Sequence, residues 1–141
     1  MENRPNKSEK ADLVAPYDPE TNPAGDGRFL CITGLVEGVH LLSVSGEIDS
    51  SVHGDFKGAI ETAVTNAHSP LVIDLTGVRY IDSSGFTDLI GARKRMTERN
   101  DRLYLVSNRA VHRLLRILGL DQVFEVYATQ REAVAAAKQN A

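Results

Sequence analysis

Residues 71–86, LVIDLTGVRYIDSSGF, join an apolar run to a string of small polar residues. The first five are apolar or β-branched apart from one aspartate, which is typical of a strand covered on both faces. Asp82 suits a helix N-cap, because its carboxylate can accept bonds from the unpaired N–H groups of a first turn. With Asp82 as cap, Ile81 and Phe86 occupy the two positions of a hydrophobic staple. The segment therefore predicts a buried strand, a short connection and a helix that begins at Ser83.

The sequence on either side alternates between strand-like and helix-like patterns. Before the segment, Phe29–Val36 and Val39–Val44 are strand candidates that a two-residue turn, Glu37-Gly38, would join as a hairpin. Leu103–Val106 and Val123–Tyr127 are candidates for later strands. Alternating strands and helices predict an α/β fold with right-handed crossovers, and the hairpin makes the sheet mixed.

Helical spacing of apolar residues separates these strands. The last helix is expected over Thr129–Ala137, and Gly119 is expected to end the one before it. The residues expected to face the core are Val52, Phe56, Ala59, Ile60, Ala63, Val64 and Ala67 on the first helix, Phe86, Leu89, Ile90 and Met96 on the second, and Val111, Leu114, Leu115 and Leu118 on the third.

Composition indicates an ordinary globular protein, with 141 residues of which 42% are hydrophobic and 25% charged. We expect one domain over residues 28–141. No apolar run approaches the roughly 20 residues of a membrane span, and the N-terminus lacks the apolar centre of a secretory signal. The expected location is the cytoplasm. Cys31 is the single cysteine, which excludes an intramolecular disulfide and a thiolate metal cluster, and a buried structural thiol is the favoured interpretation.

Charge divides the chain in two. Residues 1–27 hold three basic and six acidic residues, hence −3, together with four of the five prolines. Such a segment buries too little to offset its ordering entropy, so we expect a flexible N-terminal tail. Residues 28–141 hold thirteen basic and thirteen acidic residues and are neutral. A neutral body is a poor match for nucleic acid, whose binding depends on neutralising phosphates.

The Asp-Ser-Ser-Gly string, residues 82–85, has two interpretations. Taken alone, it is most simply a helix cap. A helix start also tolerates negative charge, because its dipole and free N–H groups stabilise anions. A phosphate on Ser83 would add about −1.5 to −2 charges without harming the fold, so its effect would fall on a protein that docks there.

Three motifs, in order, resemble those of STAS domains, in particular bacterial anti-sigma factor antagonists. The strand, loop and Asp-Ser-Ser-Gly of residues 71–86 are similar to the family signature. Residues 42–49, LSVSGEID, are similar to its Gly-Glu-Leu/Ile-Asp strand ending, and residues 107–121, SNRAVHRLLRILGLD, resemble its late helix. The resemblance covers about residues 28–138 and implies a STAS-like mixed sheet.

The resemblance also implies a site and partners. Ser83 matches the phosphoacceptor, and the residues that match its neighbourhood and the partner-binding surface are Glu47, Asp49, Asp82, Ser84, Gly85 and Phe86. In the family, the unphosphorylated protein binds an anti-sigma factor that is also a serine kinase, which releases a sigma factor. The kinase ends the complex by phosphorylation, and a serine phosphatase restores it. Phe86 departs from the usual aliphatic residue, and the 27-residue tail exceeds the family minimum. Neither metal nor cofactor is implied.

Other functions have weaker support. A serine hydrolase would need a Gly-x-Ser-x-Gly elbow, and a nucleotidase a Gly-x4-Gly-Lys-Ser/Thr loop; neither occurs. A phospho-aspartate receiver, with Asp74 or Asp82 as acceptor, lacks an acidic pair after the first strand. The nearer alternative is a STAS-domain scaffold or a small-ligand or nucleotide sensor. Basic residues on two helices are interpreted as solvated faces or as a surface that steers an acidic partner; they are Arg93, Lys94, Arg95, Arg99, Arg109, Arg113 and Arg116.

Overall fold

Glu37 and Gly38 form the turn that begins the sheet in the computed structural model, which describes residues 28–140. Both residues have positive φ, 51° and 84°, as a tight two-residue hairpin requires. The turn joins β1 (Leu30–Val36) to β2 (Val39–Ile48) as antiparallel neighbours. The predicted hairpin is confirmed, whereas the flexible tail predicted for residues 1–27 lies outside the described residues.

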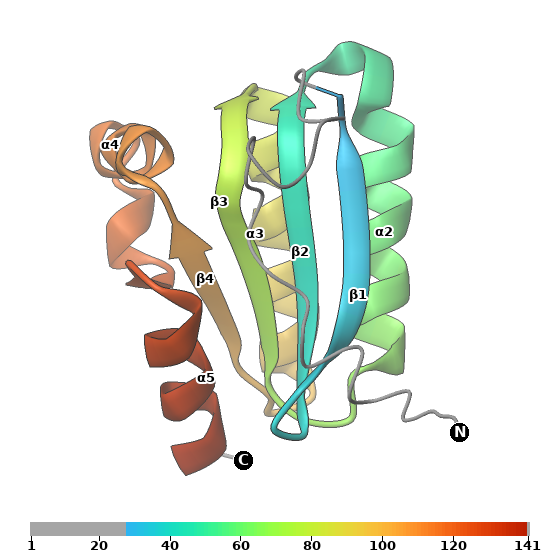
Figure 1. The fold of residues 1–141 in the computed structure, drawn as a ribbon, viewed down its shortest axis with the longest axis vertical. Helices are drawn as coiled ribbons and strands as arrows, with labels where there is room; N and C mark the ends of the chain where they lie inside the picture. Colours follow the sequence, from blue (N-terminus) through green and yellow to red (C-terminus); the bar gives the residue numbers. More distant parts are fainter. Residues whose placement is uncertain (1–27, 141) are drawn as a thin grey trace.

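The remaining strands are parallel and lie in sequence order, β1-β2-β3-β4-β5. They are β3 (Leu71–Ile81), β4 (Leu103–Ser107) and β5 (Glu125–Tyr127). The helices between and after them are α2 (His53–Asn66), α3 (Ser83–Glu98), α4 (Arg109–Ile117) and α5 (Gln130–Gln139), with short 3-10 turns η1 (Ser50–Val52) and η2 (Leu120–Gln122). The mixed α/β fold expected from the sequence is confirmed (Figure 1).

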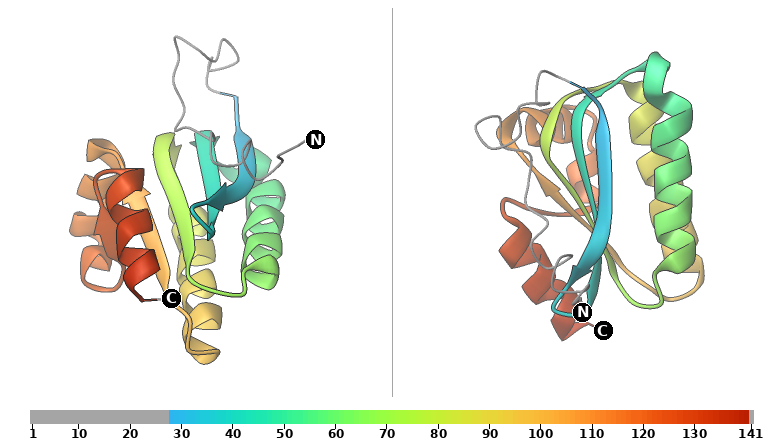
Figure 2. Two further views of the ribbon diagram at one scale, coloured as in Figure 1. Left: turned by 60° about the horizontal axis from the view of Figure 1, so that its bottom comes forward. Right: turned by 45° about the vertical axis from the view of Figure 1, so that its right-hand side comes forward.

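Helices cover both faces of the sheet, so the core has two parts. On one face α2 and α3 pack over β2 and β3, joined by Val111 and Leu115 of α4. On the other face α5 packs through Ala133, Val134 and Ala137. Figure 2 shows α2 and α3 on one side of the sheet and α5 on the other. The central strand β3 is covered on both sides along Leu71–Leu75, as its apolar run predicts.

Two apolar residues expected to face the core, Ile90 and Leu118, are exposed. Ile90 is 41% exposed, because it lies one residue past the buried Leu89 and thus about 100° round the helix. Leu118 is 55% exposed, because α4 ends at Ile117 and Gly119 turns the chain at φ 75°. The prediction was wrong for these two side chains. The last strand is also shorter than predicted: β5 begins at Glu125, so Val123, expected to begin the strand, precedes it and is 38% exposed.

Cys31 lies on β1 and packs against the larger core cluster while remaining only half-buried. Burial, reinforced by the nearby Asp55, raises the pKa of its thiol to about 12. The thiol is therefore protonated at neutral pH, which fits a packing role better than a reactive one.

Candidate functional site

The ends of β2 and β3 lie side by side and bring two of the predicted motifs together. In the parallel register Glu47 is opposite Tyr80 and Ile48 is opposite Ile81. The backbone N–H of Asp82 then donates to the carbonyl of Ile48 over 3.1 Å. Two segments more than thirty residues apart thus meet at one edge of the sheet, the carboxyl end of its parallel strands. This is the edge at which α/β sheets commonly bind ligands or partners.

Gly46 shapes the β2 end of this edge. Its φ is +97°, and a Cβ at this position would lie 2.4 Å from the carbonyl oxygen of Arg28. The ladder to β3 shifts register between Gly46 and Glu47, as at a β-bulge. Directly after this shift, the side chain of Glu47 is exposed between two buried neighbours.

Asp82 is the N-cap of α3, as predicted. Its carboxylate oxygen Oδ1 accepts from the hydroxyl of Ser84 at 2.8 Å and from the backbone N–H of Gly85 at 3.1 Å. These two bonds hold the pKa of the Asp82 carboxyl below its usual range, and the bond from Ser84 has the larger effect. The cap is therefore ionised at neutral pH, and the start of α3 already carries one negative charge.

The two serines differ in what their hydroxyls do. Ser84 is partly buried and donates to Asp82. Ser83 is exposed, and within the described part of the chain its hydroxyl makes no hydrogen bond. Its carbonyl accepts from the Thr87 hydroxyl at 3.0 Å, which secures the first turn. Of the two serines at the start of α3, Ser83 is thus the one whose hydroxyl an enzyme could reach.

Gly85 and Phe86, predicted as parts of the partner-binding surface, face the core. A Cβ on Gly85 would lie 2.7 Å from Cγ1 of Ile81 and 3.1 Å from Cγ2 of Ile48. Phe86 is 5% exposed, and Ile81 across the staple is 3% exposed. In this conformation both residues set how closely α3 approaches the sheet, and they offer a docking protein little surface.

Asp49 is also a cap rather than a free carboxylate. Its Oδ1 accepts from the backbone N–H of Ser51 at 3.0 Å and from the Ser51 hydroxyl at 2.6 Å. The side chain therefore fixes η1, the turn that leads from β2 into α2. Of the predicted acidic pair, Asp49 mainly shapes the loop, whereas Glu47 is exposed and forms no hydrogen bond or ion pair through its side chain within residues 28–140.

His53 and Asp88 form a contact that no sequence motif predicts. His53 begins α2, and its Nε2 lies 2.9 Å from Oδ2 of Asp88 on α3, whose side chain is 9% exposed. The His53 charge also contributes to lowering the pKa of Asp82. The pair therefore joins α2 to α3 beside the cap. No local pattern signals this pair, because the partners are 35 positions apart.

Asp74 and Asn108 support the site from inside. Asp74 is fully buried, and its oxygens accept from Thr76 and from Gln130, so it is not placed to accept a phosphoryl group as a receiver aspartate would. Asn108, the cap of α4, donates to the carbonyls of Thr76 and Val78. The second half of β3 is thereby tied to the start of α4.

The family model of the STAS domain matches residues 34–133 of this chain. The chain belongs to the STAS domain family. Its sequence is 36% identical over 91 residues to the anti-sigma-B factor antagonist of Listeria monocytogenes, which covers 63% of this chain and 79% of the relative. It is 28% identical over 97 residues to the anti-sigma-F factor antagonist RsfB of Mycobacterium tuberculosis, covering 69% and 80%.

A solved structure agrees with the STAS fold. The crystal structure of an anti-sigma factor antagonist from Mycobacterium paratuberculosis superposes with a TM-score of 0.73 and 28% sequence identity. The match covers 80% of this chain and 97% of that one. The match therefore leaves a larger share of this chain than of the relative without a counterpart.

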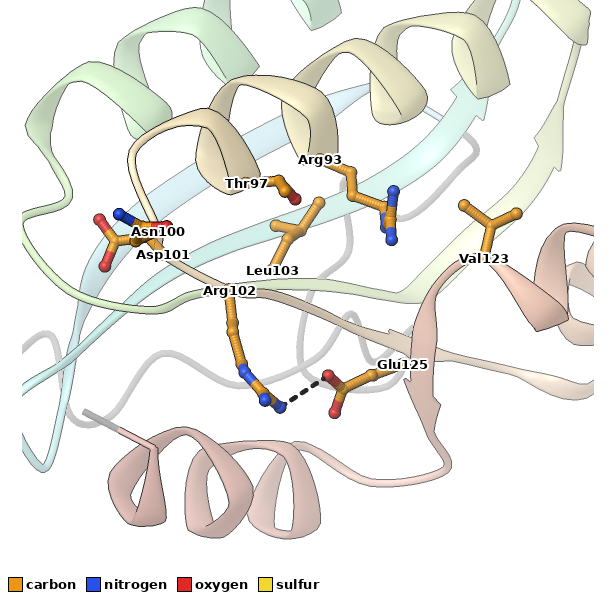
Figure 3. A pocket seen from close by; sticks show the side chains of 8 residues that line it. All are labelled: Arg93, Thr97, Asn100, Asp101, Arg102, Leu103, Val123 and Glu125. Carbon is orange, nitrogen blue, oxygen red and sulfur yellow. Dashed lines mark hydrogen bonds and ion pairs between the residues drawn. The ribbon is translucent and has the colours of Figure 1, made fainter.

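A pocket of about 340 Å³ lies at the opposite end of the STAS sheet, where β4 and β5 begin (Figure 3). Leu103 and Val123 form its apolar wall, and Arg93 points toward it from α3. Arg102 and Glu125 pair across its rim at 3.1 Å. The pocket shares no residue with the Ser83 edge.

Residues 28–140 contain neither a candidate membrane span nor a candidate metal cluster. None of the helices there has the length and apolar character needed to cross a membrane. Nor do three or more histidine, cysteine, aspartate or glutamate side chains in that range gather closely enough to hold a metal ion.

Proposed function

We propose that this STAS protein is an anti-sigma factor antagonist that is switched by phosphorylation of Ser83. In its unphosphorylated form it binds an anti-sigma factor that is also a serine kinase, and so releases a sigma factor. A serine phosphatase reverses the modification. The observation that carries the proposal is the exposed Ser83 hydroxyl, unbonded within residues 28–140, at the first position of α3.

The contrast between the two serines supports Ser83 as the acceptor. The hydroxyl of Ser84 donates to Asp82 at 2.8 Å. Phosphorylation of this hydroxyl would therefore break a bond that caps the start of α3. Phosphorylation of Ser83 breaks no such bond. The helix start also supplies free backbone N–H groups and a favourable dipole, so the fold tolerates the added anion.

The charges around Ser83 support a switch that acts on a partner. The ionised Asp82 is adjacent, and the exposed Glu47 lies at the same edge of the sheet. A phosphate adds about −1.5 to −2 charges to this group. In an interface that excludes water, desolvation and like-charge repulsion of about 3 kcal/mol would weaken binding by more than roughly a hundredfold.

The experiment incubates the purified full-length chain with ATP and each serine-kinase-type anti-sigma factor of its genome, and measures intact mass. We expect one added phosphate, mapped to Ser83 by peptide sequencing. We also expect Ser83→Ala to bind the kinase without release and Ser83→Asp to bind it at least about a hundredfold more weakly.

The matched control is Ser84→Ala, which removes the neighbouring hydroxyl and leaves Ser83 in place. It should still accept one phosphate, with a small loss of stability from the missing bond to Asp82. A phosphate on Ser84 in the wild-type chain, or equal binding by Ser83→Ala and Ser83→Asp, would contradict the switch.

One observation favours a second candidate, a scaffold or a sensor of a small ligand or nucleotide. The pocket in Figure 3 presents Arg93, which forms no ion pair with any residue of 28–140, beside the apolar side chains of Leu103 and Val123. Such a surface suits a small molecule with one anionic group. Absence of phosphorylation by every tested kinase, together with ligand-induced chemical shifts confined to these residues, would favour the sensor.

A further inference from the structure

The outer face of α4 carries a row of arginines. Arg109, Arg113 and Arg116 are spaced by four and three residues, so they lie on one side of the helix, and all three are exposed. They line a hollow of about 560 Å³ together with Ala110 and His112. The helix contains no acidic residue, so its own sequence offers no compensating charge.

These three arginines are unpaired within residues 28–140. Other basic side chains there do have carboxylate partners: Arg99 contacts Asp101, Arg102 contacts Glu125, and Lys138 contacts Glu37. None of the described carboxylates reaches the α4 row. The row is therefore an uncompensated surface of three positive charges.

The complementary charge is present in the same chain. Residues 11–27 contain four acidic residues and no basic one; the acidic residues are Asp12, Asp18, Glu20 and Asp26. The same stretch has Leu13, Val14 and Tyr17 between its acidic residues. Beside Arg113 on α4, Ile117 is 69% exposed and offers an apolar contact for such side chains. Residues 11–27 therefore carry the acidic and apolar side chains that would complement the arginines and Ile117 of α4.

Arg28, the first described residue after this stretch, lies at the same end of the sheet as α4. It lies against Gly46 near the end of β2, while the α4 cap Asn108 donates to the carbonyl of Val78 on the adjacent strand β3. Neighbouring strands are about 4.8 Å apart, and an extended chain spans about 3.3 Å per residue. The start of β1 and the helix α4 are at the same end of the sheet (Figure 1). Because residues 11–27 are joined to the fold through Arg28, their effective concentration at α4 is on the order of millimolar.

From this match we infer that residues 11–26 bind along the arginine face of α4, formed by Arg109, Arg113 and Arg116. The interaction is intramolecular and electrostatic, with apolar support from Ile117. It does not depend on the phosphorylation of Ser83. Three exposed ion pairs shift the bound population by roughly tenfold, so the contact is reversible.

The test uses the full-length chain with Cys31→Ala and a spin label attached at Thr21→Cys. Amide signals are recorded by NMR with the label paramagnetic and then reduced. We expect the signals of residues 109–117 to lose intensity while the label is paramagnetic. Salt at about 0.5 M should restore them, because it screens exposed charges within a few ångströms.

Charge reversal at Arg109, Arg113 and Arg116 to glutamate should abolish the intensity loss. The matched control reverses Arg93, Lys94 and Arg95 on α3, which changes the net charge by the same amount, and it should leave the loss at α4 intact. The inference is overturned if the α4 signals are unaffected by the label, or if both reversals restore them equally.

Discussion

The backbone N–H of Asp82 bonds to the carbonyl of Ile48 over 3.1 Å, so the residue that caps α3 is joined directly to the end of β2. The cap therefore does more than begin a helix. It links the end of β2, which carries Glu47, to the first turn of α3, which carries Ser83. Substitutions at the cap should consequently affect stability and the site together.

Replacing Asp82 by alanine should lower the free energy of unfolding by about 1 kcal/mol, within the range of 0.5–2 kcal/mol for lost N-caps. The variant loses the bonds to the Ser84 hydroxyl and the Gly85 N–H while it keeps the backbone bond to Ile48. Urea unfolding followed by circular dichroism measures the change. Asp82→Asn, which keeps an acceptor oxygen, should recover most of the loss, and an equal loss in both variants would refute the capping role.

The depressed pKa of Asp82 makes its contribution depend on pH. Because the folded pKa lies below the ordinary value of 3.8, the contribution is fully present above that value and is lost as pH falls through the folded pKa. The stability difference between the wild-type chain and Asp82→Asn should therefore be constant near neutrality and shrink below pH 3.8. Unfolding by urea across this range measures it. A difference that stays constant down to the lowest pH would contradict the shift.

Gly85→Ala should destabilise the protein by about 1–3 kcal/mol, as overpacking of a filled core does. The new Cβ would lie 2.7 Å from Cγ1 of Ile81, and the staple against Phe86 leaves that side chain little room to move. Thermal unfolding measures the effect.

Gly91→Ala is the matched control on the same helix, because nothing lies within 4 Å of a Cβ at that position. It should be neutral or stabilise the protein by up to about 1 kcal/mol, since alanine is the better helix former. Equal destabilisation by the two substitutions would mean that the close contact of Gly85 is not the cause.

Local signals in the sequence predicted most of the fold and part of the site. The Glu37-Gly38 turn, the covered strand at Leu71 and the cap at Asp82 each depend on neighbouring residues alone, and the structure confirms each. The exposure of Ser83 also followed from its place in the first turn of a capped helix.

Features that depend on distant contacts were missed. The His53–Asp88 pair and the bonds from Asn108 to β3 join residues about thirty positions apart, so no short pattern reports them. Gly85 and Phe86 were assigned to a surface through resemblance, whereas packing against Ile81 and Ile48 turns them inward. Which side of an apolar helix faces the sheet is decided by this packing, and Ile90 was misassigned for that reason.

Ile90 is exposed on the same side of α3 as Ser83. The residues Ser83, Thr87, Ile90 and Lys94 are spaced by four, three and four positions and are all exposed, so they form one stripe on the helix. If a partner docks over Ser83, it should also cover Ile90. Burying an isoleucine contributes about 1.5–3 kcal/mol, so Ile90→Gln should weaken partner binding by about tenfold or more.

Ile32→Gln is the control for this prediction, because Ile32 has the same side chain and the same 41% exposure but lies on β1, away from α3. Both substitutions are at surface positions and should change the free energy of unfolding by no more than about 0.5 kcal/mol. Titration calorimetry with the partner identified by phosphorylation of Ser83 compares their affinities. Because stability is matched, a loss of affinity confined to Ile90→Gln would locate the interface on the stripe, and equal affinities would exclude α3 as the docking surface.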